Sequence, residues 1–181
     1  MPDIAIFILM VLATLILDEV LHIAGRPALG RYLGYIGTGL LIVSFTYSAR
    51  KRKLIEWGKP ATHLRVHEFL TWLGAVLILV HGGVHFNALL PWLAIGAMLI
   101  AVASGLTGKF LFKRSRGIVT ARRAQLKNDG HSTAEVAEQL YWDILLVDLM
   151  KQWRIVHLPI TILFAFLALL HILSVLLFWR W

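Results

Sequence analysis

The stretch HEFLTWLGAVLILVH, residues 67–81, begins and ends with histidine and is apolar over most of its length. A second stretch, HLPITILFAFLALLH at residues 157–171, has the same length and the same terminal histidines. In an α-helix, 14 residues return the chain to within roughly 40° of the same face and advance it about 21 Å. That advance fits inside a hydrocarbon core about 30 Å thick. Each stretch is therefore predicted to lie in a transmembrane helix that carries one imidazole near each membrane face.

The composition of the whole chain agrees with a membrane protein. Of its 181 residues, 59% are hydrophobic, and the mean hydropathy is +0.74, which is too apolar for a soluble domain of this size. The apolar residues fall into five runs, at about 4–24, 32–49, 64–86, 90–112 and 155–179. The sequence predicts an all-α integral membrane bundle of five transmembrane helices, a single domain over residues 1–181. The first run lacks a basic start and a cleavage site, so it is expected to be retained.

The absence of cysteine limits the cofactors that the chain can bind. Without cysteine the chain has no disulfides, no thiolate-bound iron–sulfur cluster and no covalent c-type haem. Any haem must therefore be bound non-covalently. The net charge of +8 comes from residues that flank the apolar runs, so the lipid bilayer and not nucleic acid is the expected partner.

The distribution of basic residues predicts the topology. Fifteen of the 18 lysines and arginines flank the second run or the long loop at 113–153, namely Arg50, Lys51, Arg52, Lys53, Lys59, Arg65, Lys109, Lys113, Arg114, Arg116, Arg122, Arg123, Lys127, Lys151 and Arg154. The positive-inside rule places that side in the cytoplasm. The N-terminus is then cytoplasmic and the C-terminus outside, as expected in a bacterial inner membrane. The third and fifth runs consequently cross the membrane in the same direction.

Parallel helices place the histidines in two pairs at matching depths. His67 and His157 lie near the cytoplasm, and His81 and His171 lie near the outer face. Ionisable residues inside membrane spans are costly and tend to mark function. Two iron-centred haems b, each held by one histidine from either helix, would account for all four. Ligation by two histidines leaves iron no open position, which suits electron transfer. The alternative is that each histidine is a core residue bonded to a neighbouring backbone group.

Two further histidines leave the choice of ligands open. His63 lies four residues before His67, and His85 lies four residues after His81, so either could replace its neighbour. The equal 14-residue spacing favours His67 and His81. His85 is then expected to contact a propionate or a quinone at the outer surface, and a third haem between His22 and His85 is an alternative. The two H-x-x-x-H pairs cannot converge on a di-iron centre, because they lie at opposite membrane faces.

Several residues are candidate haem contacts. Gly74 lies midway between the two histidines of its run, where a missing side chain would let a porphyrin approach closely. The alternative role for this glycine is close helix packing. Arg65 and Arg154, with Lys109 and Lys113, lie at the depth of the inner haem and are candidate partners for its propionates. Their alternative role is snorkelling to the membrane interface.

The outer end of the first run carries Asp18, Glu19 and His22. Carboxylates beside a histidine at membrane depth could accept protons from a quinol, although all three could also lie just outside the hydrocarbon. They are the candidate quinone and proton site.

The long loop at 113–153 contains its own predicted helix. Ser132 followed by Glu135 is a capping-box pattern, and an amphipathic helix is expected from there to Trp153. Its apolar face comprises Val136, Leu140, Ile144 and Val147. We expect this cytoplasmic helix to lie along the membrane surface or under a partner. The alternative is a solvated loop that folds over the bundle.

The two histidine-bounded segments resemble the di-haem core of b-type membrane cytochromes. That core occurs in the cytochrome b subunits of quinol-oxidising complexes and in ferric-reductase-like membrane domains. The resemblance covers about residues 63–175 and not the first run. It implies that His67 with His157, and His81 with His171, are axial ligands of two low-spin haems b. The chain lacks the flavin and nicotinamide domain of many ferric reductases and has fewer spans than cytochrome b, with no match to its quinol-site motif.

These features together predict a di-haem cytochrome b subunit. It would carry electrons across the membrane between a quinone pool and a redox partner in a respiratory or photosynthetic complex. Other membrane or peripheral redox subunits are therefore expected partners, and the chain is expected to be an electron-transfer subunit and not a complete enzyme. One alternative is a ferric or quinone reductase-like module that works with a separate flavoprotein. Another is a non-redox membrane scaffold whose histidines are structural.

Overall fold

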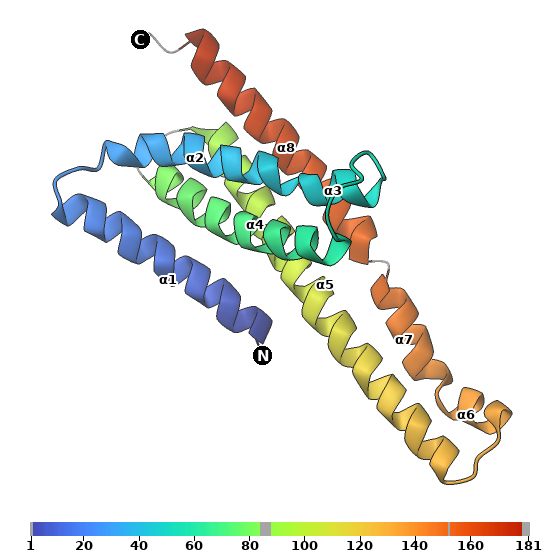
Figure 1. Cartoon of the computed structure of the whole chain (residues 1–181). Helices are drawn as coiled ribbons and strands as arrows, with labels where there is room; N and C mark the ends of the chain where they lie inside the picture. Colours follow the sequence, from blue (N-terminus) through green and yellow to red (C-terminus); the bar gives the residue numbers. More distant parts are fainter. Residues whose placement is uncertain (1, 84–87, 152, 179–181) are drawn as a thin grey trace.

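The computed structural model describes residues 2–83, 88–151 and 153–178. In these residues the chain is all-α, as predicted, and forms eight helices (Figure 1). They are α1 (Pro2–Ile23), α2 (Leu29–Ser44), α3 (Thr46–Lys51), α4 (Pro60–Gly83), α5 (Leu89–Asn128), α6 (Thr133–Gln139), α7 (Tyr141–Lys151) and α8 (Trp153–Phe178).

Four of these helices contain a segment long and apolar enough to cross a membrane. The segments are Ile4–Ile23 in α1, Pro60–Gly83 in α4, Leu89–Gly108 in α5 and Ile155–Phe178 in α8. Each is 20 residues or longer, and about 20 apolar residues are needed to span the hydrocarbon core. Four of the five predicted spans are thus confirmed as candidate spans, which indicates an integral membrane protein.

The second predicted span, 32–49, is interrupted in the structure. It is divided between α2 and α3, which meet at Phe45. The Phe45 backbone N–H donates to the Ile42 carbonyl, three residues back, so the helix tightens as it ends. With 16 residues, α2 is about 24 Å long, shorter than the hydrocarbon core. The range predicted as the second span is therefore helical but divided, and it is not among the four candidate spans.

Glycines set the close packing of α2 on α4. A Cβ atom added to Gly37 would lie 3.0 Å from the Gly74 carbonyl oxygen, and one added to Gly74 would lie 3.1 Å from the Gly37 carbonyl oxygen. The two backbones therefore touch at these residues, because neither has a side chain to separate them. Gly30 and Gly34 of α2 are also buried. This contact makes α2 and α4 a tightly packed antiparallel pair.

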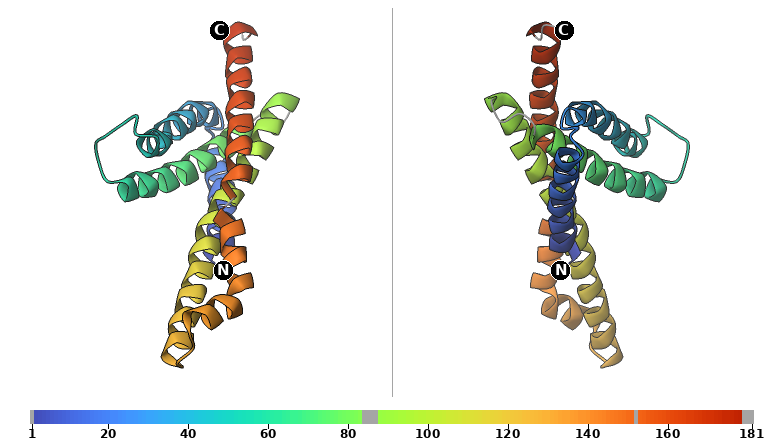
Figure 2. Two further views of the ribbon diagram at one scale, coloured as in Figure 1. Left: turned by 90° about the vertical axis from the view of Figure 1, so that its right-hand side faces the viewer. Right: turned by 90° about the vertical axis from the view of Figure 1, so that its left-hand side faces the viewer.

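The apolar core lies where α1, α2, α4 and α5 meet. Its buried residues are Met10, Leu41, Ala75, Val76, Met98 and Val102. The indole Nε1 of Trp72 donates to the Ile6 carbonyl at 3.4 Å and joins α4 to α1. Helix α8 packs along α5 and reaches this core with Phe164, although none of its described side chains is fully buried. Figure 2 shows the α2–α4 pair projecting to one side of the axis formed by α5 and α8.

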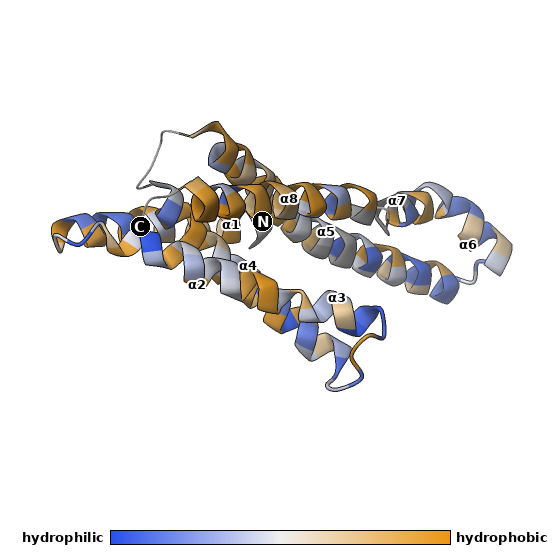
Figure 3. Ribbon diagram, turned by 90° about the horizontal axis from the view of Figure 1, so that it is seen from above, coloured by the Kyte–Doolittle hydropathy of each residue, from blue (hydrophilic) through white to orange (hydrophobic). Residues whose placement is uncertain are grey.

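The second half of α5 continues far beyond its apolar segment. With 40 residues, α5 is about 60 Å long, and α6 and α7 fold back along it (Figure 1). We call residues 109–151 the helical arm. Figure 3 shows hydrophilic residues along the α5 part of the arm, whereas α1 and α8 are mostly hydrophobic.

The helical arm corrects the prediction of one amphipathic helix from Ser132 to Trp153. The predicted capping box is present, because Ser132 Oγ accepts from the Glu135 N–H at 3.3 Å and Glu135 Oε2 accepts from the Ser132 N–H at 2.7 Å. The chain then forms two helices that meet at Leu140. Val136, Leu140 and Val147 are buried as α6 and α7 pack against α5. The expected apolar face therefore covers this chain's own helix instead of a membrane or a partner.

Candidate functional site

The structure brings the four histidines together in the two predicted pairs. The ring centroids of His81 on α4 and His171 on α8 are 6.4 Å apart, with their planes inclined by 50°. Two metal–imidazole bonds of about 2 Å, together with the ring radii, span roughly 6 Å. At the other end of the same helices, His67 and His157 are close enough to interact electrostatically. Because each pair joins α4 to α8 in the same order along the chain, the two helices run in the same direction.

The backbones of α4 and α8 stay apart although their histidines meet. Among the described residues, no Cα atom of α4 lies within 8 Å of a Cα atom of α8. Side chains alone therefore span the distance between these two helices. Ordinary helix packing brings axes to about 8–10 Å, so α4 and α8 are not packed directly backbone against backbone.

The two histidines of α4 are both oriented by α2. His67 Nδ1 donates to the Ser44 carbonyl at 3.1 Å, and His81 Nδ1 donates to the Gly30 carbonyl at 3.2 Å. A carbonyl oxygen can only accept, so each Nδ1 carries the proton and each Nε2 retains its lone pair. This is the tautomer that a metal-ligating imidazole uses when its other nitrogen contacts a backbone carbonyl.

The register of α2 on α4 produces both hydrogen bonds at once. Ser44 and Gly30 lie seven residues on either side of Gly37, as the two histidines lie seven residues on either side of Gly74. Because Gly37 and Gly74 are in contact, the antiparallel packing places one carbonyl opposite each histidine. The 14-residue period predicted for α4 is thus repeated in its neighbour.

Gly34 provides the space for the His81 ring. A Cβ atom at this position would lie 2.7 Å from His81 Cγ and 2.8 Å from His81 Nδ1. Any larger residue would therefore displace the imidazole. Gly34 begins the glycine-rich stretch GYIGTG at residues 34–39, but only the paired helices show what this glycine faces.

The His157 ring contacts α5. Its Nδ1 is 2.8 Å from Ser104 Oγ, and the Ser104 hydroxyl itself donates to the Ala101 carbonyl at 2.8 Å. Gly105 lies beside the same ring, where a Cβ atom would be 3.4 Å from His157 Cε1. Ser104 was not predicted from the sequence, because a serine in an apolar span gives no sign of the residue it faces.

His63 has a structural contact of its own. Its Nε2 bonds to the Trp57 carbonyl at 3.1 Å, and its ring meets the Trp57 ring edge-on at 4.7 Å. The side chain is buried, with 5% exposed, and holds the loop before α4. His67 stacks instead on Tyr47 of α3, with ring centroids 5.5 Å apart. These contacts favour His67 over His63 as the histidine that faces α8.

The remaining candidate haem contacts have different surroundings. A Cβ atom on Gly74 would lie 3.0 Å from Leu41 Cδ2, so the contact that the structure gives Gly74 is helix packing with α2. Arg65 is exposed on α4, near His67 in sequence. His85 and the side chains of Arg154, Lys109 and Lys113 lie outside the described residues.

The acidic candidates on α1 lie beside the end of α4. Asp18 Oδ1 would be 3.6 Å from a Cβ atom on Gly83, two residues after His81. That oxygen is buried and has no hydrogen-bond partner in the described part of the chain. His22 donates from Nδ1 to the Asp18 carbonyl at 2.9 Å, with the Asp18 carboxylate 3.8 Å away. Glu19 is exposed.

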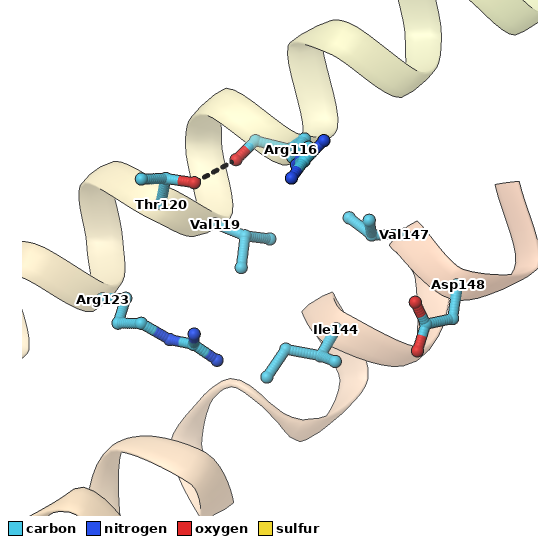
Figure 4. A pocket seen from close by; sticks show the side chains of 7 residues that line it. All are labelled: Arg116, Val119, Thr120, Arg123, Ile144, Val147 and Asp148. Atoms are coloured by element: carbon cyan, nitrogen blue, oxygen red, sulfur yellow. Dashed lines mark hydrogen bonds between the residues drawn. The ribbon is translucent and has the colours of Figure 1, made fainter. Parts of the chain in front are cut away.

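A separate groove lies in the helical arm, between α5 and α7 (Figure 4). Arg116 and Arg123 of α5 and Asp148 of α7 surround its apolar floor of Val119, Ile144 and Val147. The arm also contains an ion pair between Arg122 and Asp143, with N and O atoms 3.2 Å apart. Opposite charges on α5 and α7 thus flank the apolar contact that holds the arm together.

The described residues contain no group of three or more His, Cys, Asp and Glu side chains suited to hold a metal ion. No family model matches the chain, and no curated protein or solved structure is significantly similar to it. The structure defines an all-α integral membrane protein in which two histidine pairs join helices whose described backbones stay more than 8 Å apart.

Proposed function

We propose that this protein is a di-haem cytochrome b subunit that carries electrons across a membrane between a quinone pool and a redox partner. The observation that supports this most strongly is the pairing of His81 with His171 across two helices whose backbones stay apart. The second pair, His67 and His157, also relates α4 to α8, at the other end of the helices.

The histidines have the chemistry that axial ligation requires. Three of the four, His67, His81 and His157, use Nδ1 in a hydrogen bond and so present Nε2 to the neighbouring helix. His67 and His157 would hold one haem b, and His81 and His171 the other. When bound, the haems supply one-electron redox chemistry. Two histidine ligands leave iron no open position, which favours electron transfer over oxygen chemistry.

The position of α2 supports a five-span topology. Although it is short, α2 runs from the level of His81, which Gly30 contacts, to the level of His67, which Ser44 contacts. It therefore crosses the same depth as the histidine-bounded part of α4. A span of this length is accommodated by tilt of its neighbours or local thinning of the bilayer. The basic residues around α3 then lie on the side of the helical arm, in the cytoplasm.

The quinone site is proposed at the outer end, beside His81. Asp18 presents a buried carboxylate oxygen next to Gly83, and His22 bonds to the Asp18 backbone. A quinol that transfers electrons at the outer haem releases protons, which this carboxylate is positioned to accept. Asp18 and His22 would then carry those protons toward the exposed surface.

Spectroscopy on the purified full chain tests this function. A reduced-minus-oxidised spectrum with haem quantitation is expected to give about two b-type haems per chain. Replacing His81 or His171 with alanine is expected to remove the same haem, and replacing His67 or His157 the other. His131→Ala, on the helical arm, is the matched control and should retain both. A colourless protein from haem-sufficient cells, or losses in crossed pairs, would refute the proposal.

A further inference from the structure

The hydrogen bonds that orient the paired histidines differ in one respect. On α4, both Nδ1 atoms bond to backbone carbonyls of α2, which no substitution can remove. On α8, His157 bonds to a side chain, the hydroxyl of Ser104, and also to the Ala101 backbone carbonyl one turn earlier on α5. Of these two contacts to the His157 ring, only the one from Ser104 can be removed by a substitution.

The direction of this hydrogen bond follows from the geometry. The Ser104 hydroxyl has a single hydrogen, and it is directed to the Ala101 carbonyl one turn earlier on α5. The oxygen can then only accept from His157, so Nδ1 of His157 carries the proton. The lone pair is left on Nε2, the nitrogen on the opposite side of the ring.

We infer that Ser104 is the positioning residue of His157, which steadies the ring and directs Nε2 toward the helix that carries His67. This inference rests on the proposed function, in which these two histidines hold one haem. A hydrogen bond at the second nitrogen fixes the orientation of a ligating imidazole and raises its basicity. Gly105 completes the contact, because a ring 3.4 Å from its Cβ position has little room to turn toward α5.

Ser104→Ala is expected to affect one haem only. The change removes the hydroxyl acceptor and leaves the Ala101 carbonyl as the remaining partner of the ring, so the His157 ring is held less firmly and can rotate more. Loss of such a contact typically weakens metal binding about 10–100-fold, and haem dissociation from the His67–His157 site should increase by a similar factor. The less basic imidazole stabilises ferric iron less well, so the reduction potential of that haem should become more positive. Ser104→Thr retains the hydroxyl and should restore both properties.

Thr107→Ala is the matched control. Thr107 lies on the same helix, and its hydroxyl also donates to a backbone carbonyl, that of Ala103 at 2.9 Å. It is exposed, so its removal should leave both haems unchanged. The experiment is a potentiometric titration and a haem-retention assay on the purified full chain in each variant, compared with the haem lost in His67→Ala.

The outcomes separate the inference from the proposed function. A selective change in the haem that His67→Ala removes, restored by Ser104→Thr, would support the inference. Wild-type protein with two haems whose retention and potentials are unchanged in Ser104→Ala would overturn the inference and leave the function standing. A change in the other haem, or one that Ser104→Thr does not restore, would also overturn it. Wild-type protein without haem would refute both.

Discussion

Replacing Gly34 with alanine should remove the haem at the His81–His171 pair. The new Cβ atom would lie 2.7 Å from His81 Cγ, 2.8 Å from Nδ1 and 2.9 Å from Cδ2. Carbon atoms normally approach to about 3.5–4.0 Å, so the ring must move by roughly 1 Å. The ring bonds to the Gly30 carbonyl on the same helix as Gly34, so the imidazole cannot move away from α2 without weakening this bond.

A displacement of this size matters because a metal tolerates only a narrow range of ligand distances. Ligand distances hold to within about 0.2 Å, so haem content should fall from about two to about one per chain in the same variant. The substitution also raises helix propensity by about 1 kcal/mol, which favours folding of α2. The expected result is therefore selective loss of one haem without general unfolding.

Gly39→Ala is the control for this measurement. Gly39 lies on the same helix, and a Cβ atom there would meet nothing within 4 Å. It gains the same helix propensity and should keep both haems. Haem quantitation and reduced-minus-oxidised spectra compare the two variants, and circular dichroism follows their helix content. If Gly34→Ala retained two haems with unchanged potentials, the contact of α2 with His81 would have no part in haem binding.

Three further predictions concern other parts of the fold. Leu140→Ala should destabilise the helical arm by about 2–5 kcal/mol, because Leu140 is fully buried. Thermal unfolding measures this loss, and haem quantitation on the same variant should still give two haems per chain. The Ser132 backbone N–H donates to the Glu135 carboxylate and holds the pKa of that carboxyl below its usual range. The hydrogen bond therefore stabilises the start of α6 at pH values above the usual pKa of a glutamate. This stabilisation is lost as the pH falls through the lowered pKa. Amide exchange at α6 should accordingly increase in acid, and Glu135→Gln should show a flat pH response. His63→Ala should increase proteolysis of the loop at Trp57, to which His63 bonds, but leave two haems; loss of a haem would instead make His63 a ligand.

Several features were evident in the residue pattern. The apolar runs predicted the four candidate spans because about 20 apolar residues in succession have few alternatives to a membrane helix. The pairing of the four histidines followed from their spacing together with the basic loops, because parallel helices with equal offsets bring equal depths together. Ser132 and Glu135 predicted a helix start correctly, since a capping box depends only on residues three apart.

Other features depend on contacts between distant segments. Gly74 proved to face Gly37, and the roles of Ser44, Gly30 and Ser104 were not apparent in the sequence. The sequence around a small or polar residue predicts the helix in which it lies but not the neighbouring helix that it faces. The neighbour depends on how two helix surfaces fit together.

In the helical arm, too, the sequence predicted an apolar face but not the surface that covers it. Its apolar periodicity predicted a surface to be covered, but α5 of this chain covers it. Burial of an apolar face stabilises any arrangement that removes it from water, so periodicity alone does not distinguish a membrane, a partner and a neighbouring helix. Local patterns thus determined the helices and the two sets of imidazoles, whereas the packing of α2 and α5 decided which carbonyl or hydroxyl group holds each ring.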